Sequence, residues 1–346
     1  MRNRTSPTLV AVGLAISGMA SLHPDAARAA GWAVEGVVGK EGKEAEDVSG
    51  IACAPEADGA RLCLLIDDEV QFAQWVTLKD REIVPGELLP LIAGFFDEEP
   101  VELDGEGAAF ADGAFYVTGS FGQPRSGAPD EEGAARLKAD THLFRIVLDS
   151  ASSGSSLQIS DSRRLRSVAL EDVDLKPFAD KELKENGLTV EAIAVLGDTA
   201  YIGFRGPVLG DAKDRAAILP LPLASLFDGA PLPADTAVRK LPLGKGQGIR
   251  DLAPVGDELL VLAGPVGDRD EDHLAEGAYR LFRWNPQSND PIEVFTIEAA
   301  THGDNKPDKP EAIQPLAKSE GKLEVLVLSD GPDLGAPKSY QIDWAE

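Results

Sequence analysis

The stretch EGAAFADGAFYVT, residues 106–118, decides the fold. It consists of a charged leading residue, a short apolar run, a tight Asp-Gly turn and a second apolar run. Two-residue turns of this kind between apolar runs are the strongest short-range indication of a β-hairpin. The stretch therefore predicts two antiparallel strands joined at Asp112-Gly113.

The same pattern occurs five times along the chain. A Gly/Asp turn follows the leading residue after six positions in three copies, and a similar turn follows after nine positions in the other two. Self-similarity at a long period indicates a repeat architecture such as a propeller. The copies begin at Ser49-Gly50-Ile51, Glu106-Gly107-Ala108, Glu191-Ala192-Ile193, Arg250-Asp251-Leu252 and Glu311-Ala312-Ile313.

Each repeat continues beyond its hairpin into further strand-like runs. In the fourth copy these are residues 279–284 and 292–297, which gives four antiparallel strands, the blade of a β-propeller. The last copy ends with its third strand at 339–344, and the run 32–38 can pair with it. Such pairing closes the ring and removes exposed sheet edges. We therefore predict an all-β fold, a single five-bladed propeller over residues 30–346 closed by an N-terminal strand.

Three segments interrupt the repeats. Residues 169–186, rich in Leu, Lys, Asp and Glu, are predicted to be partly helical, and residues 122–139 are predicted to be a mobile loop. The acidic segment 268–272 is interpreted as a solvated loop. Because the leading residues are 57, 85, 59 and 61 positions apart, a six-bladed ring with a degenerate blade in the long interval is the alternative.

Residues 1–29 are organised like an export signal. Arg2 and Arg4 precede an apolar stretch at 8–22, and Ala27-Arg28-Ala29 offers a small-x-small cleavage site. The apolar stretch is short for a membrane span, and no later segment reaches the required length. We therefore expect a periplasmic or secreted protein, with an uncleaved anchor as the alternative.

The chain is strongly acidic, with a formal net charge of −26. Residues 1–29 contain three arginines and one aspartate, so their removal leaves −28. This charge repels nucleic acid and anionic membrane surfaces and favours cations or a basic partner. For the net charge alone, simple solubility is the more common explanation.

The two cysteines, Cys53 and Cys63, lie on the strands that flank the Asp58-Gly59 turn. In an exported chain, an even and paired cysteine count favours a disulfide. Closure of this short loop is expected to contribute about 2–3 kcal/mol to stability.

The first strand of a propeller blade is innermost, so the leading residues are expected to face a central channel. Several carboxylates brought together away from water cost free energy unless arginines, a cation, water or a ligand offset their charge. The predicted channel ring is Ser49, Glu106, Glu191, Arg250 and Glu311, joined at the ends of the second strands by Arg205 and by Asp67, Asp68, Glu69, Ser120, Ser329 and Asp330.

Carboxylate and hydroxyl oxygens are the ligands that Ca²⁺ and Mg²⁺ prefer. We therefore predict that Glu106, Glu191 and Glu311 hold such a cation. The alternative is a girdle in which Arg205 and Arg250 tie the carboxylates together and hold the blades. No nucleotide or organic cofactor motif is present, and neither a Gly-x-Ser-x-Gly elbow nor histidines at zinc-ligand spacing occur.

The runs LDGEGAA at 103–109, YIGFRGPV at 201–208 and GIRDL at 248–252 resemble a bacterial family of exported, propeller-like proteins, domain of unknown function 3616. The resemblance covers most of the chain after residue 29 and implies a propeller with no established reaction. The Glu-Gly-Ala and Glu-Ala-Ile starts more distantly resemble esterase-like phytases and gluconolactonase-type propellers. Those families place carboxylates around a metal in the central tunnel, and Ser49 and Arg250 depart from that pattern.

Two functions follow from these residues. The first is a binding module that holds a cation or a small polar ligand in its central tunnel. The second is a metal-dependent hydrolase of phosphoric or carboxylic esters or of lactones. In the hydrolase, one carboxylate acts as general base, and Arg205 and Arg250 stabilise the anionic transition state.

Overall fold

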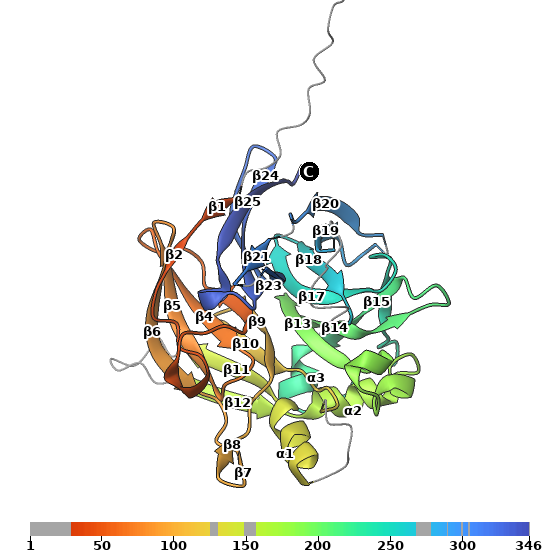
Figure 1. Ribbon diagram of the computed structural model, residues 1–346. Helices are drawn as coiled ribbons and strands as arrows, with labels where there is room; N and C mark the ends of the chain where they lie inside the picture. The colour runs from red at the N-terminus through yellow and green to blue at the C-terminus, as the bar shows by residue number, and fades with distance from the viewer. Residues whose placement is uncertain are drawn as a thin grey trace, which may run out of the picture.

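The computed structural model describes residues 29–124, 131–148, 157–267, 278–288, 290–298, 300–303 and 305–345. These residues form a five-bladed β-propeller whose sheets are arranged around a central axis (Figure 1). Residues 1–28 of the expected export signal and the acidic segment 268–272 lie outside the described residues. No helix among the described residues is long and apolar enough to cross a membrane.

Each blade contains four strands that follow one another along the chain from the channel outward, apart from the last strand of the fifth blade. The sheet of the first blade has a fifth, short strand at its outer edge. The strands of the first blade are β3 (Val48–Cys53), β4 (Arg61–Asp67), β5 (Phe72–Lys79) and β6 (Glu82–Pro90); of the second, β9 (Gly105–Ala111), β10 (Ala114–Gly119), β11 (Leu143–Leu148) and β12 (Leu157–Ser162); of the third, β13 (Thr189–Leu196), β14 (Thr199–Leu209), β15 (Arg215–Pro222) and β16 (Arg239–Leu241); of the fourth, β17 (Gln247–Val255), β18 (Glu258–Pro265), β19 (Arg280–Trp284) and β20 (Ile292–Thr296); and of the fifth, β23 (Lys309–Ser319), β24 (Lys322–Asp330) and β25 (Lys338–Asp343).

The leading residue of every repeat occupies a β-bulge. In each of the five blades the pairing between the first two strands skips one residue of the inner strand at this position. In the second blade, for example, Gly105 pairs with Gly119 and Gly107 pairs with Thr118, which leaves Glu106 unpaired. A bulge of this kind re-aims a side chain. The sequence repeat therefore marks five equivalent bulges, one on each inner strand.

The ring is closed by an N-terminal strand, as predicted, but over a shorter and earlier range than residues 32–38. Strand β1 (Ala30–Gly31) pairs with β25, so that Ala30 lies opposite Ser339. The chain then crosses to the first blade, where β2 (Ala33–Val34) runs parallel to β6. The segment therefore divides its backbone hydrogen bonds between the last and the first blades.

The described residues form five blades and no sixth blade between the second and third repeats, so the six-bladed alternative is wrong. The long interval between these two repeats contains α2 (Arg164–Glu171), η2 (Lys176–Phe178) and η3 (Leu183–Glu185), in agreement with the partly helical prediction. The prediction of a mobile loop at 122–139 is wrong for its second half, which forms α1 (Glu131–Asp140). Alanine, leucine, arginine and lysine favour helix there, and two glutamates complement the positive end of its dipole.

Short elements decorate the blades. The hairpin of β7 (Phe95–Phe96) and β8 (Glu99–Pro100) and helix α1 lie on the same side of the molecule (Figure 1). The remaining elements are η1 (Lys40–Gly42), α3 (Leu223–Phe227), β21 (Thr301–His302), β22 (Lys306–Pro307) and η4 (Asp333–Gly335).

The hydrophobic core lies between neighbouring sheets. One cluster joins Ala192 and Ile218 of the third blade to Ile249 and Trp284 of the fourth, and corresponding clusters join the other blades. The Trp284 side chain is fully buried and packs edge-on against Tyr201 with ring centroids 5.9 Å apart. Burial of apolar faces between adjacent sheets therefore holds the ring together.

The predicted disulfide between Cys53 and Cys63 is present. The two residues lie directly opposite each other on β3 and β4. The bond therefore closes the hairpin of the first blade.

Replacement of both cysteines in the Cys53→Ala, Cys63→Ala variant should lower the free energy of unfolding by about 2–3 kcal/mol, because the unfolded chain loses a short closed loop. Urea denaturation of the variant and of oxidised wild type measures the difference, and reduced wild type is the matched control. A variant as stable as oxidised wild type would contradict this prediction.

Candidate functional site

The channel-facing residues of the third, fourth and fifth blades form a salt-bridge network. Arg250 donates from Nε to Glu311 Oε2 over 2.6 Å, and its Nη1 lies 3.7 Å from Glu191 Oε1. Arg205 donates from Nη1 to the same Glu191 oxygen over 3.1 Å and from Nε to the Val266 carbonyl over 2.9 Å. We call Glu191, Arg205, Arg250 and Glu311 the arginine–glutamate network.

This network neutralises two of the three predicted ring glutamates. Glu191 and Glu311 are buried, with exposed fractions of 2% and 3%, and both lie against an arginine. Buried ion pairs are costly to break, because the remaining partner is left as an uncompensated charge. The geometry therefore has the features expected of the girdle across these three blades.

A further residue of the fourth blade connects it to the fifth. The buried Asp251 carboxylate accepts hydrogen bonds from the backbone N–H groups of Leu252 and Ile313, both over 2.7 Å. In the second blade the equivalent position is Gly107, where an added Cβ would lie 3.0 Å from the Ile193 nitrogen. The sequence analysis did not single out Asp251; its signal is an aspartate at a position that is Gly or Ala in the other four repeats.

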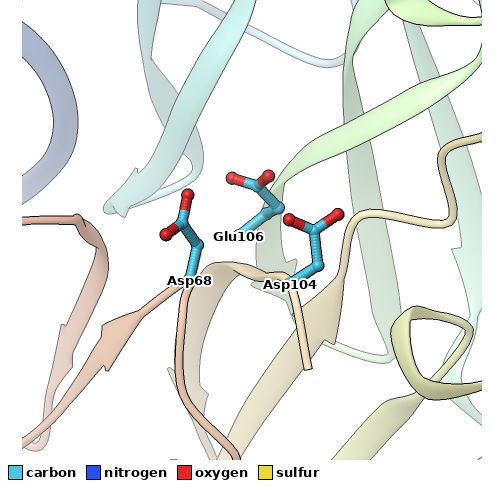
Figure 2. A group of neighbouring side chains, drawn as sticks. All are labelled: Asp68, Asp104 and Glu106. Atoms are coloured by element: carbon cyan, nitrogen blue, oxygen red, sulfur yellow. The ribbon is translucent and has the colours of Figure 1, made fainter. Parts of the chain in front are cut away.

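On the side of the first two blades the channel opens into an acidic cavity of about 560 Å³. Three carboxylates of its wall form a group that we call the carboxylate triad, Asp68, Asp104 and Glu106. One oxygen from each lies within 4.8 Å of the others. Figure 2 shows the three carboxyl groups side by side, with Asp68 and Asp104 on the two sides of Glu106.

Local backbone geometry places the triad. Asp68 directly follows β4, Asp104 directly precedes β9, and Glu106 occupies the bulge of β9. Asp104 has a φ of 52°, a left-handed conformation that aspartate tolerates better than most residues. It also accepts a hydrogen bond from the Ser120 hydroxyl. The neighbouring Gly105 is required, because a Cβ there would lie 2.7 Å from Ile66.

Ionisation of the carboxyl groups of the triad is unfavourable in the folded protein. Burial raises the pKa of Asp68 well above its usual value, and the charge of Asp104 raises it further. Burial likewise raises the pKa of Glu106, with the charge of Glu191 as the next cause. The buried Asp68 Oδ1 has no hydrogen-bond partner among the described residues. A cation between these groups would offset these unfavourable terms.

Two more aspartates contribute to the acidity of this region. Asp140, at the end of α1, lines the same cavity, and burial raises its pKa to about 9, with the charge of Asp104 as the next cause. Asp67 lies outside the cavity wall but is buried, and its Oδ1 accepts a hydrogen bond from the Glu69 N–H over 3.1 Å.

The structure divides the predicted site residues between these two places. Glu191, Arg205, Arg250 and Glu311 form the network, whereas Glu106 lies with Asp68 and Asp104; the set Glu106, Glu191 and Glu311 as metal ligands stays a prediction. Ser49 donates to the Asp47 carbonyl over 3.3 Å and lies outside the cavity wall, as do Asp67 and Ser329. Glu69, Ser120 and Asp330 line the cavity.

Sequence reasoning missed five carboxylates of the cavity wall: Asp47, Glu102, Asp104, Glu132 and Asp140. Asp104 belongs to a quoted run, and its signal is an Asp-Gly pair directly before the leading glutamate. Asp140 directly follows the segment 122–139 that was predicted to be a loop, and it is the last residue of α1, so its position on the wall depends on the packing of that helix. No local sequence pattern predicts the position of Asp140 on the cavity wall.

The variant Arg250→Ala should lower the free energy of unfolding by about 3–5 kcal/mol, because Glu311 and Glu191 lose their buried partner. Chemical denaturation measures this loss. The control is Lys322→Ala, which removes an exposed ion pair with Asp343 and should cost about 0–1 kcal/mol. Equal effects of the two substitutions would contradict a structural role for the network.

Asp67 should make stability fall as the pH rises. Burial, with the nearby Asp47 as second cause, raises the pKa of Asp67 from 3.8 to about 7. Between these values the folded chain holds a proton that the unfolded chain has lost, so the free energy of unfolding decreases with increasing pH. Denaturation of wild type and Asp67→Asn from pH 4 to pH 8 with chelator present tests this. The free energy of unfolding of Asp67→Asn, relative to that of wild type, should increase as the pH rises. A difference between the two proteins that stays constant from pH 4 to pH 8 would contradict this prediction.

Comparison with known proteins finds similar solved structures and one family model. Solved structures similar to this chain include an exo-β-1,3-galactanase from Clostridium thermocellum, with 9% identity, a TM-score of 0.45 and coverage of 90% of this chain and 62% of that chain. The phi92 phage endosialidase has 11% identity, a TM-score of 0.42 and coverage of 91% and 56%. A thermostable family-43 glycoside hydrolase has 12% identity, a TM-score of 0.39 and coverage of 86% and 89%.

The chain spans between 52% and 62% of the first three solved chains that it resembles. No curated protein matches it. Residues 145–339 match the family model described as protein of unknown function, DUF3616. Because this match covers more than half of the chain, the protein belongs to the DUF3616 family.

Proposed function

We propose that this protein is a binding module whose acidic cavity holds a divalent cation, Ca²⁺ or Mg²⁺, at Asp68, Asp104 and Glu106. The observation that carries the proposal is the triad itself, three carboxylate oxygens within 4.8 Å of one another, with a buried Asp68 oxygen that lacks a hydrogen-bond partner among the described residues.

The repulsion within the triad supports a cation of charge two or more. Two carboxylates about 4.8 Å apart repel each other by about 3–4 kcal/mol at an effective dielectric constant near 20. A divalent ion adds an attraction to every carboxylate that it contacts, and these attractions outweigh the repulsion between the carboxylates. The cation therefore offsets both the repulsion and the cost of burial.

The donor set favours calcium or magnesium over zinc. The triad offers only carboxylate oxygens, and the described cavity wall contains no histidine or cysteine. Oxygen ligands suit Ca²⁺ and Mg²⁺, whereas structural and catalytic zinc sites use nitrogen or sulfur ligands. Three protein ligands leave further positions for water or for a ligand in the cavity.

The arginine–glutamate network explains why Glu191 and Glu311 are not part of the proposed cation site. Glu191 and Glu311 already have buried arginine partners, so their negative charge is compensated. Glu106 has no ion pair with a described residue, and it lies with Asp68 and Asp104. Of the three predicted ligands, Glu106 is therefore retained in the proposed site.

A metal-dependent hydrolase of an ester or lactone is the second candidate, because Asp140 and Arg205 line the same cavity as the triad. Burial raises the pKa of Asp140 to about 9, so it would carry a proton at neutral pH and could act as a general acid. Arg205 could stabilise a developing negative charge.

We further propose that the protein is exported, with residues 1–29 as the signal. An oxidising compartment outside the cytoplasm suits the Cys53–Cys63 disulfide.

Cation binding is tested by calorimetric titration of the chelator-treated protein with CaCl₂ and MgCl₂, together with the melting temperature. We expect stoichiometric binding that raises the melting temperature, because the ion binds only the folded triad. Asp68→Asn and Glu106→Gln should each weaken binding at least about tenfold, equivalent to about 1.4 kcal/mol. Glu69→Gln, on the same wall but outside the triad, is the matched control and should bind like wild type.

Absence of binding at millimolar cation, or equal binding by wild type and both triad variants, would overturn the proposal. Hydrolysis is a separate measurement with carboxylic-ester, phosphate-ester and lactone substrates. Turnover that is lost on chelation and in Glu106→Gln would establish the second candidate. No turnover, with cation binding intact, would leave the binding module.

A further inference from the structure

The cavity as a whole carries far more negative than positive charge. The residues of its wall include ten carboxylates and four basic side chains, a formal excess of six negative charges. One divalent cation at the triad would compensate only two of them. The remaining charge is therefore a property of the cavity beyond the proposed metal site.

All four basic side chains of the wall already have carboxylate partners. Lys40 donates to Glu102 over 2.8 Å and Arg136 donates to Glu132 over 3.0 Å, both near the exposed rim. The other two pairs are Arg205–Glu191, at 3.1 Å, and Lys309–Asp330, at 3.0 Å. An anionic ligand such as a phosphate would therefore have to break an existing ion pair and enter a negative field.

Several carboxylates of the wall, in contrast, have no basic partner among the described residues. Asp47, Asp68, Glu106 and Asp140 form no ion pair with a described residue. Asp140 is the most informative of them, because its side chain is 5% exposed and its buried Oδ1 has no hydrogen-bond partner among the described residues. A buried acceptor without a partner on a cavity wall calls for a hydrogen-bond donor from a ligand. The raised pKa of Asp140 keeps its carboxyl group protonated at neutral pH in the free protein, and a positive charge bound beside it would lower that pKa and favour the ionised form.

The wall offers little to an apolar or aromatic ligand. Among its described residues, Pro124 and Leu183 are the larger apolar side chains, and no aromatic side chain is present. Stacking and cation–π contacts are therefore absent from this part of the wall. Recognition must depend on charge and on hydrogen bonds to carboxylate oxygens.

We propose that the cavity binds a multiply charged aliphatic amine, a polyamine, whose ammonium groups lie against Asp140 and the other unpaired carboxylates. Each primary ammonium group supplies three donors and a positive charge, which matches a wall of unpaired acceptors. A flexible aliphatic chain needs no aromatic surface, and the volume of about 560 Å³ lies within the usual range for small-ligand cavities. This inference goes beyond the proposed cation site and does not require the metal.

The test is calorimetric titration of the chelator-treated full chain with spermidine, in low salt and in 0.5 M salt. We expect binding that weakens at least about tenfold in high salt, because salt screens the attraction between the approaching charged amine and the acidic cavity as a whole. Asp140→Asn and Asp47→Asn should each weaken binding at least about threefold. Asp343→Asn, an exposed carboxylate on β25 outside the cavity, is the matched control and should have no effect.

The outcomes separate this proposal from the metal proposal. Calcium binding without spermidine binding would overturn the amine site and leave the metal site standing, whereas spermidine binding without calcium binding would do the reverse. Inorganic phosphate or glucose that binds more tightly than spermidine would also overturn the amine site. Melting curves establish that each variant is folded, and Asp47→Asn keeps the test available if Asp140→Asn does not fold.

Discussion

The β-bulge at the start of each inner strand is the constraint on which the rest of the structure depends. It occurs at the same position in all five blades and places Ser49, Glu106, Glu191, Arg250 and Glu311 at equivalent points around the channel. Four of these residues are charged, so the fold must neutralise them or leave them with a ligand. In the third to fifth blades, Glu191 and Glu311 pair with Arg205 and Arg250, so their charges neutralise one another. In the second blade, Glu106 is left beside two more carboxylates.

Local signals account for what the sequence predicted correctly. Apolar runs around Asp112-Gly113 and its counterparts define the hairpins, the spacing of the repeats defines five blades, and the cross-strand positions of Cys53 and Cys63 indicate the disulfide. The range of the closing strand was wrong because Trp32 lies at the crossing point, where its N–H donates to Pro337 of the last blade before the chain joins the first. No local sequence pattern predicts which of the two sheet edges each part of this segment pairs with.

The candidate site was only partly predictable, because ion-pair partners depend on distances between blades. Arg250, Glu106 and Glu311 are all leading residues of their repeats, and no sequence pattern indicates which of the two glutamates Arg250 contacts. The structure shows Arg250 turned toward Glu311 and Glu191. Asp140 comes from α1, an insertion within the second blade, and its position depends on how that helix packs rather than on the repeat.

The charge distribution itself argues that the cavity has a function beyond closing the ring. A propeller blade does not need a carboxylate at the leading position, because Ser49 fills that position in the first blade without a charge. The arginine–glutamate network already connects three blades without help from Asp68, Glu106 or Asp140. Burial of these three carboxyl groups raises their pKa values, which means that their ionised forms are unfavourable in the folded chain. Groups that reduce stability and add no bond to the fold are expected where a ligand compensates them.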